Sequence, residues 1–132
     1  MDVTMAVAAE DVQIKRSPQG DKINILGVFD KVTCGEVPCS IEQIMVIIGF
    51  SASPTEFGAQ RLVKVDVLDP DGAILATSPR TYTVPHAPWA GRRSFFHAIF
   101  PFQPVTFHRL GPHSFSVSVG EDHKVDVPVY VS

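Results

Sequence analysis

The chain has 132 residues, of which 45% are hydrophobic and 19% are charged, so it can bury one hydrophobic core but not two. We therefore expect a single domain, residues 1–132. Eleven Lys and Arg residues against fourteen Asp and Glu residues give a net charge of −3, which argues against nucleic acid as a partner because sequence-independent binding needs a basic surface.

The first ten residues have neither the basic region nor the sustained apolar region of a secretory signal, and they carry acids at Asp2 and Glu10. The longest apolar run, residues 44–50, is much shorter than the roughly 20 residues that a membrane-spanning helix needs. The sequence therefore predicts a cytoplasmic protein with no membrane partner.

Alternation of apolar and polar residues predicts strands along the chain. Residues 4–15 and 22–32 form the first two, separated by a Ser-Pro-Gln-Gly-Asp turn at 17–21. Residues 41–51 are apolar on both faces, which is typical of a central strand covered on both sides.

A hairpin is predicted next, because Val63, Val65 and Val67 alternate with polar residues before an Asp-Pro-Asp-Gly turn at 69–72. The same four residues could begin a calcium loop, but the later acidic ligand is missing, so the turn is favoured.

The second half of the chain contains a loop at residues 85–93 and three more strands, at 94–102, 113–119 and 125–131. Prolines and glycines separate short strands at regular spacing. The pattern predicts an all-β fold, a β-sandwich of seven to nine strands.

Several segments together resemble a bacterial domain-of-unknown-function family, numbered 6941. They are Glu-Asp-Val at 10–12, Lys-Ile-Asn-Ile-Leu-Gly-Val-Phe-Asp at 22–30, the Asp-Pro-Asp-Gly turn, and a C-terminal hairpin with Phe-Ser-Val at 115–117 and Val-Pro-Val at 127–129. The resemblance covers nearly the whole chain and implies an immunoglobulin-like antiparallel β-sandwich with no established activity. Such sandwiches often have a tyrosine corner; the matching position here is His113, whose ring N–H could bond the nearby backbone in the same way.

Cys34 and Cys39 lie in one short loop. A disulfide is geometrically possible, but a reducing cytosol favours free or reversibly paired thiols. A zinc site would need two more ligands, for which His108 and His113 are candidates. The predicted strand order places them at the opposite end of the fold, so we expect no metal and no cofactor.

The loop at 85–93 is the candidate ligand-binding site, because Trp89, Arg92 and Arg93 combine contact area with directed donors, and His86 could add another. Alternatively, Trp89 folds back over one sheet as a lid while the arginines are solvated, which is the favoured expectation. Named catalytic motifs are absent from the sequence, so we expect no enzyme. An enzyme would need His108 or His113 with a carboxylate in one cleft.

Apolar residues on the outer side of two predicted strands form a candidate interface: Met45, Ile47, Phe95 and Ile99. A soluble monomer rarely exposes such a face. The loop at 85–93, the segment 106–112 or a second subunit could cover it. We therefore expect a non-enzymatic interaction module that works by protein association, including self-association through a sheet face or an edge strand. The alternative is a domain that binds a small molecule or an anion at the Trp89 loop.

Overall fold

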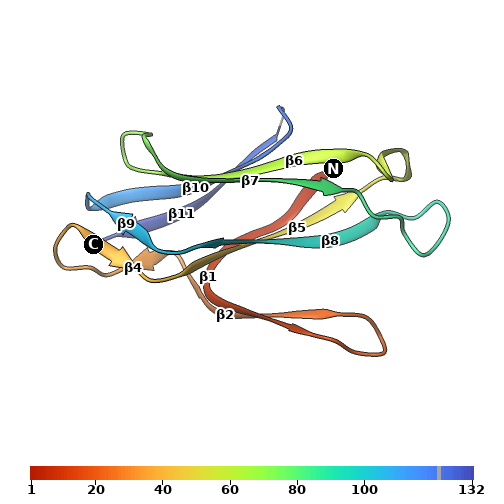
Figure 1. Ribbon diagram of the computed structural model, residues 1–132, viewed down its shortest axis with the longest axis horizontal. Helices are drawn as coiled ribbons and strands as arrows, with labels where there is room; N and C mark the ends of the chain where they lie inside the picture. The colour runs from red at the N-terminus through yellow and green to blue at the C-terminus, as the bar shows by residue number, and fades with distance from the viewer. Residues whose placement is uncertain (122) are drawn as a thin grey trace.

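The structure is a computed structural model that describes residues 1–121 and 123–132. These residues contain one short 3-10 helix, η1 (Pro54–Glu56), and no α-helix, which confirms the predicted all-β fold. The strands are β1 (Asp2–Lys15), β2 (Lys22–Phe29), β3 (Lys31–Val32), β4 (Cys39–Ile41), β5 (Ile44–Ala52), β6 (Gln60–Leu68), β7 (Ile74–Thr83), β8 (Ser94–Phe102), β9 (Val105–Phe107), β10 (Gly111–Val119) and β11 (His123–Val131) (Figure 1). No helix among the described residues is long and apolar enough to cross a membrane.

The described residues form eleven strands, more than the seven to nine predicted. The excess lies in β3, β4 and β9, which have two or three residues each. Strands this short cover about one period of side-chain alternation, so the sequence holds no pattern that would reveal them.

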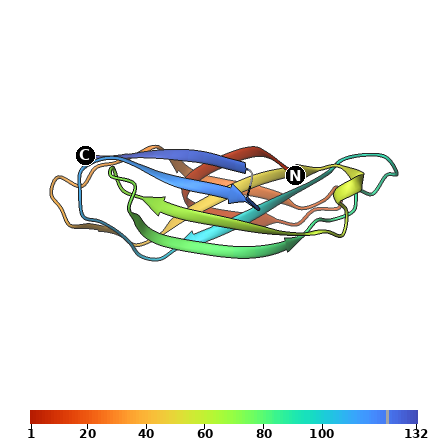
Figure 2. The ribbon, with the colours of Figure 1, turned by 90° about the horizontal axis from the view of Figure 1, so that it is seen from above.

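The strands form two large sheets and one small sheet. The first large sheet has the order β2-β1-β5-β8, and the second has the order β3-β11-β10-β6-β7, while β4 pairs with β9. Neighbouring strands are antiparallel except for β11 and β3, which are parallel. The large sheets face each other as two layers (Figures 1 and 2), and Phe50, Phe100 and Phe115 are among the buried side chains of the core between them.

Strand β5 lies between β1 and β8, as its two apolar faces predict. Ile44, Val46, Ile48 and Phe50 point into the main core. Ile47, on the opposite face, is also 0% exposed. Both faces of β5 are therefore covered within a single chain.

The predicted hairpin is formed by β6 and β7. Its turn is closed by the N–H of Gly72, which donates to the carbonyl oxygen of Asp69 (3.0 Å). Oδ1 of Asp69 also accepts from the N–H groups of Asp71 (2.9 Å) and Ala73 (2.8 Å). The first Asp of the motif therefore stabilises the turn, which is the role that Asp commonly has in this position.

Cys34 and Cys39 form a disulfide, so of the two predicted alternatives the thiols are paired and not free. The predicted placement of the two histidines is wrong. Cys39 lies directly opposite Phe107 in the β4–β9 pair, and His108 is the next residue. This long-range pairing joins two three-residue strands, so no sequence pattern indicated it. Among the described residues, no group of three or more His, Cys, Asp or Glu side chains is placed to hold a metal ion.

His113 stands near the start of β10 and is 3% exposed. Its Nδ1 donates to the carbonyl oxygen of Gly111 (3.0 Å), so the ring makes the backward backbone bond that the resemblance implies. The ring also packs edge-on against Phe107, with 5.0 Å between centroids. The His113 side chain therefore has a structural role, because it packs in the core and bonds the nearby backbone.

Candidate functional site

The loop that joins β7 to β8 begins from an anchored position. Val84 is fully buried, its N–H donates to the carbonyl oxygen of Ala59 (2.8 Å), and its own carbonyl accepts from Gly58 (2.9 Å). The loop therefore leaves the body of the protein from a fixed point, although residues 85–93 are mostly at the surface.

A tight turn forms the tip of this loop. The N–H of Arg92 donates to the carbonyl oxygen of Trp89 (3.3 Å), and Gly91 has a φ of +75°. A type II turn needs a positive φ at its third residue, which glycine adopts without strain. The turn fixes where the side chains of Trp89 and Arg92 leave the backbone.

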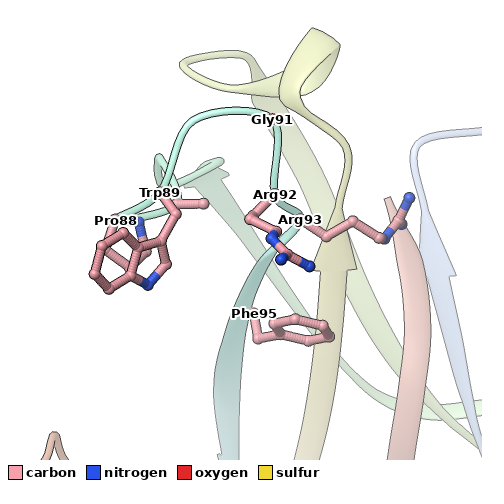
Figure 3. A pocket seen from close by; sticks show the side chains of 7 residues that line it. Pro88, Trp89, Gly91, Arg92, Arg93 and Phe95 are labelled. Carbon is pink, nitrogen blue, oxygen red and sulfur yellow. The ribbon is translucent and has the colours of Figure 1, made fainter.

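An open cavity of about 790 Å³ lies beside the turn (Figure 3). Three of the four residues predicted to bind a ligand line it, namely Trp89, Arg92 and Arg93. Phe95, which the sequence assigned to a separate interface, lines the same cavity from β8. The structure therefore brings residues of both predicted sites into one surface.

The two aromatic side chains of this surface are open to solvent. Trp89 is 72% exposed and Phe95 is 71% exposed. The expectation that Trp89 folds back over a sheet is therefore wrong. In Figure 3, the indole lies to one side of β8, next to the loop that precedes this strand.

The adjacent arginines have different surroundings. Nη2 of Arg93 donates to Oδ2 of Asp2 (2.7 Å) and to Oγ of Ser51 (3.1 Å), so Arg93 is ion-paired instead of simply solvated. The guanidinium of Arg92 has no hydrogen-bond or ion-pair partner among the described residues. In Figure 3, the Arg93 side chain extends toward β1, whereas Arg92 lies above Phe95. We call Trp89, Arg92 and Phe95 the loop surface.

His86 does not line this cavity. Its side chain is exposed and lies next to the ring of Phe57, with 5.2 Å between ring centroids. The structure therefore separates His86 from the other three predicted ligand-binding residues.

The candidate interface residues lie on the outer face of the first large sheet, but their exposure differs. Ile47 is completely buried, Met45 and Ile99 are partly buried, and Phe95 is exposed. Met45 and Ile47 lie opposite Pro101 and Ile99 in the β5–β8 register. Phe95 lies near the start of β8, opposite Ser51 and at the other end of the strand from Pro101. It belongs to the loop surface.

The β1–β2 hairpin covers part of this outer face. Residues 21–25 of the hairpin share a cavity of about 470 Å³ with Met5 and His97, which flank Gly49 on the same face as Ile47. Figure 1 shows the hairpin extending below β5 and β8. The sequence predicted three segments or partners that could cover the apolar face, and this hairpin was not among them. Its alternating residues predict ordinary strands of a sheet and give no sign that the hairpin lies over an outer face.

The model of the family of unknown function DUF6941 matches residues 4–132. The chain belongs to this family. A comparison with curated proteins gives no match. The description of DUF6941 states no activity.

For this DUF6941 protein, the sequence indicated the loop residues but missed two partners that define the site. Asp2 lies ninety-one positions before Arg93, and Phe95 was assigned to another surface. Strand alternation reveals which residues share a face, but it does not show which distant strand supplies an ion-pair partner.

Proposed function

We propose that the protein is a non-enzymatic interaction module that binds a protein partner through the loop surface. The observation that carries this proposal is the combination of two aromatic side chains, Trp89 and Phe95, each more than 70% exposed, with the unpaired guanidinium of Arg92 on one cavity. Trp and Arg are enriched among the residues that dominate binding energy at protein interfaces.

The chemistry of the loop surface indicates the kind of partner it fits. The Arg92 guanidinium offers directed donors to a carboxylate, and the two aromatic rings offer area to apolar side chains. We therefore propose a protein segment in which an Asp or Glu lies beside a large apolar residue. Arg93 has a supporting role in this proposal, because Asp2 already holds it.

A display library of random peptides, selected on the full chain, tests this proposal. We expect the enriched peptides to contain an acidic residue next to an apolar one. Trp89→Ala and Arg92→Ala should each weaken their binding at least about tenfold, equivalent to roughly 1.4 kcal/mol. Because Trp89 is the single Trp of the chain, its fluorescence reports binding at the site directly.

His86→Ala is the matched control, because His86 is an exposed residue of the same loop that does not line the cavity. It should leave peptide binding unchanged. The proposal fails if the enriched peptides bind the Trp89→Ala and Arg92→Ala variants as tightly as the original chain.

A second candidate function is the binding of a small anion at the same cavity. The unpaired guanidinium of Arg92 favours it, and the cavity of about 790 Å³ has room for a small molecule. Inorganic phosphate and citrate are suitable probes. Binding would raise the unfolding temperature by mass action, and Arg92→Ala would remove that shift. Equal shifts in both proteins would exclude this function.

We also infer that the two facing sheets form an immunoglobulin-like sandwich. The order β1-β5-β8 in one sheet and β11-β10-β6-β7 in the other supports this inference. It corresponds to strands A, B and E facing strands G, F, C and C′ of that fold. The backward bond of His113 near the start of β10 stands where the tyrosine corner of strand F would be. In this interpretation β2 is an addition to the edge of the first sheet.

A further inference from the structure

The edges of the two large sheets differ in how well they are protected from pairing with another chain. Strands β2 and β8 form the edges of the first sheet, and β7 forms one edge of the second. Proline lies within β7 at Pro79 and within β8 at Pro101. A proline has no N–H to donate to an added strand, so it protects an edge.

The other side of the second sheet is protected in a similar way. Its last strand, β3, has two residues and pairs with Tyr130 and Val131 of β11. The part of β11 that β3 leaves uncovered contains Pro128. Among the edge strands of the described residues, β2 is therefore the one with eight or more residues and no proline.

Strand β2 also exposes apolar side chains. Leu26 is 43% exposed and Val28 is 59% exposed. An edge strand with unpaired backbone groups and open apolar side chains favours the addition of another strand.

The charges around β2 fit a second copy of the same strand. The sequence from 21 to 31 reads Asp-Lys-Ile-Asn-Ile-Leu-Gly-Val-Phe-Asp-Lys, and its four charged residues are all exposed. If two copies run antiparallel with Leu26 opposite Leu26, then Lys22 falls opposite Asp30 and Asp21 falls opposite Lys31. Each contact occurs twice, and all four pairs have opposite charge.

The apolar residues agree with the same register. Ile23 falls opposite Phe29, and Ile25 falls opposite Gly27 of the other copy. Gly27 has a φ of +69°, so the strand is kinked there, and the two kinks lie at equivalent positions on either side of the centre. Opposite charges and apolar pairs on facing positions each stabilise neighbouring strands.

We propose that β2 is the surface through which two copies of this chain associate, antiparallel and centred on Leu26. The contact has twofold symmetry, so it closes on itself and gives a dimer. It joins the two first sheets into one continuous sheet. This dimer uses residues 21–31, none of which belongs to the loop surface, so either proposal can fail without the other.

Charge exchange tests both the dimer and its register. Sedimentation velocity over a range of concentrations should show a dimer of the full chain. Lys22→Asp and Asp30→Lys should each raise the dimer dissociation constant about tenfold or more, because each places like charges opposite one another at two symmetric positions. The double variant restores opposite charges and should recover most of the lost affinity. Arg16→Glu, an exposed change of similar size outside β2, should leave the dimer intact.

A cross-link tests the centre of the register. Leu26→Cys places two thiols directly opposite each other, within about 5.5 Å between Cβ atoms, so mild oxidation should give a covalent dimer. Val28→Cys serves as the matched control. Its two copies would lie four residues apart along the strands, about 13 Å, and should not cross-link. A chain that stays monomeric at all concentrations overturns the proposal, and so does a dimer that the double charge exchange fails to restore.

Discussion

Arg93 and Asp2 form an ion pair that links the start of β8 to β1 across the intervening strand β5. Nη2 of Arg93 lies 2.7 Å from Oδ2 of Asp2, although ninety-one positions separate the residues in the chain. The same nitrogen donates to Ser51 of β5 at 3.1 Å. The base of the loop is thus attached to two strands, whereas the tip presents Trp89 and Arg92 to solvent.

This relationship predicts that the adjacent arginines differ in their effect on stability. Arg93→Ala should lower the free energy of unfolding by about 0.2 to 1 kcal/mol, the usual range for an exposed ion pair. Arg92→Ala should leave it unchanged, because that guanidinium has no partner among the described residues. Urea unfolding of both variants measures the difference. Equal losses would contradict the assignment of separate roles.

The disulfide leads to a second prediction. Cys34 and Cys39 are five positions apart and close a short loop, so the chain-entropy model assigns the bond about 2 kcal/mol of stability. The Cys34→Ser, Cys39→Ser double variant should lose that amount when unfolding is measured without reductant. With reductant, the original chain and the variant should become equal. Intact mass gives an independent measurement, because the bonded form is lighter by two hydrogens.

The longer strands could be predicted from the sequence, because alternation in segments such as 61–68 and 94–102 assigns each residue to a face. The two apolar faces of β5 also indicated its central position. The β4–β9 pair could not be predicted, since three-residue strands carry no period, and the error in placing His108 followed from it.

The site was predictable in its residue types but not in its geometry. The loop composition indicated Trp89 and Arg92 as contact residues. The exposure of the Trp89 side chain depends on what the rest of the chain leaves uncovered, and the role of Arg93 depends on the distant Asp2. Local sequence pattern shows neither, because both depend on how segments far apart in the chain are placed. The position of the β1–β2 hairpin beside Met5 and His97 on the outer face of the first sheet was missed for the same reason.

His113 gives a third prediction, because its two ring nitrogens have different environments. Nδ1 donates to Gly111, while Nε2 is buried with no hydrogen-bond partner. His113→Phe removes the bond and also the unpaired nitrogen, so the free energy of unfolding should change by less than about 1 kcal/mol. His113→Ala leaves a cavity beside Phe107 and should cost about 2 to 4 kcal/mol. Thermal and urea unfolding of the two variants provide the comparison, and a loss for His113→Phe as large as that for His113→Ala would show that the bond to the Gly111 backbone contributes most of the stability.

Glu56 gives a prediction about pH. A hydrogen bond from the N-terminal amine of Met1 is the main cause that lowers the pKa of Glu56, and the backbone N–H of Ser53 lowers it further, while burial opposes both. The folded protein therefore holds the Glu56 carboxylate ionised at lower pH than the unfolded chain, whose glutamates titrate near pH 4.3. The stabilisation is complete above that pH and is lost as the pH falls through the lower pKa of the folded state.

Glu56→Gln should consequently destabilise the protein at pH 7, and its difference from the original chain should shrink as the pH falls below about 4.3. Urea unfolding between neutral and acidic pH measures this difference. Glu36→Gln is the control, because Glu36 is exposed and has no hydrogen-bond partner among the described residues; its difference from the original chain should stay small throughout. A Glu56→Gln difference that is the same at every pH would show that the ion pair with Met1 contributes nothing.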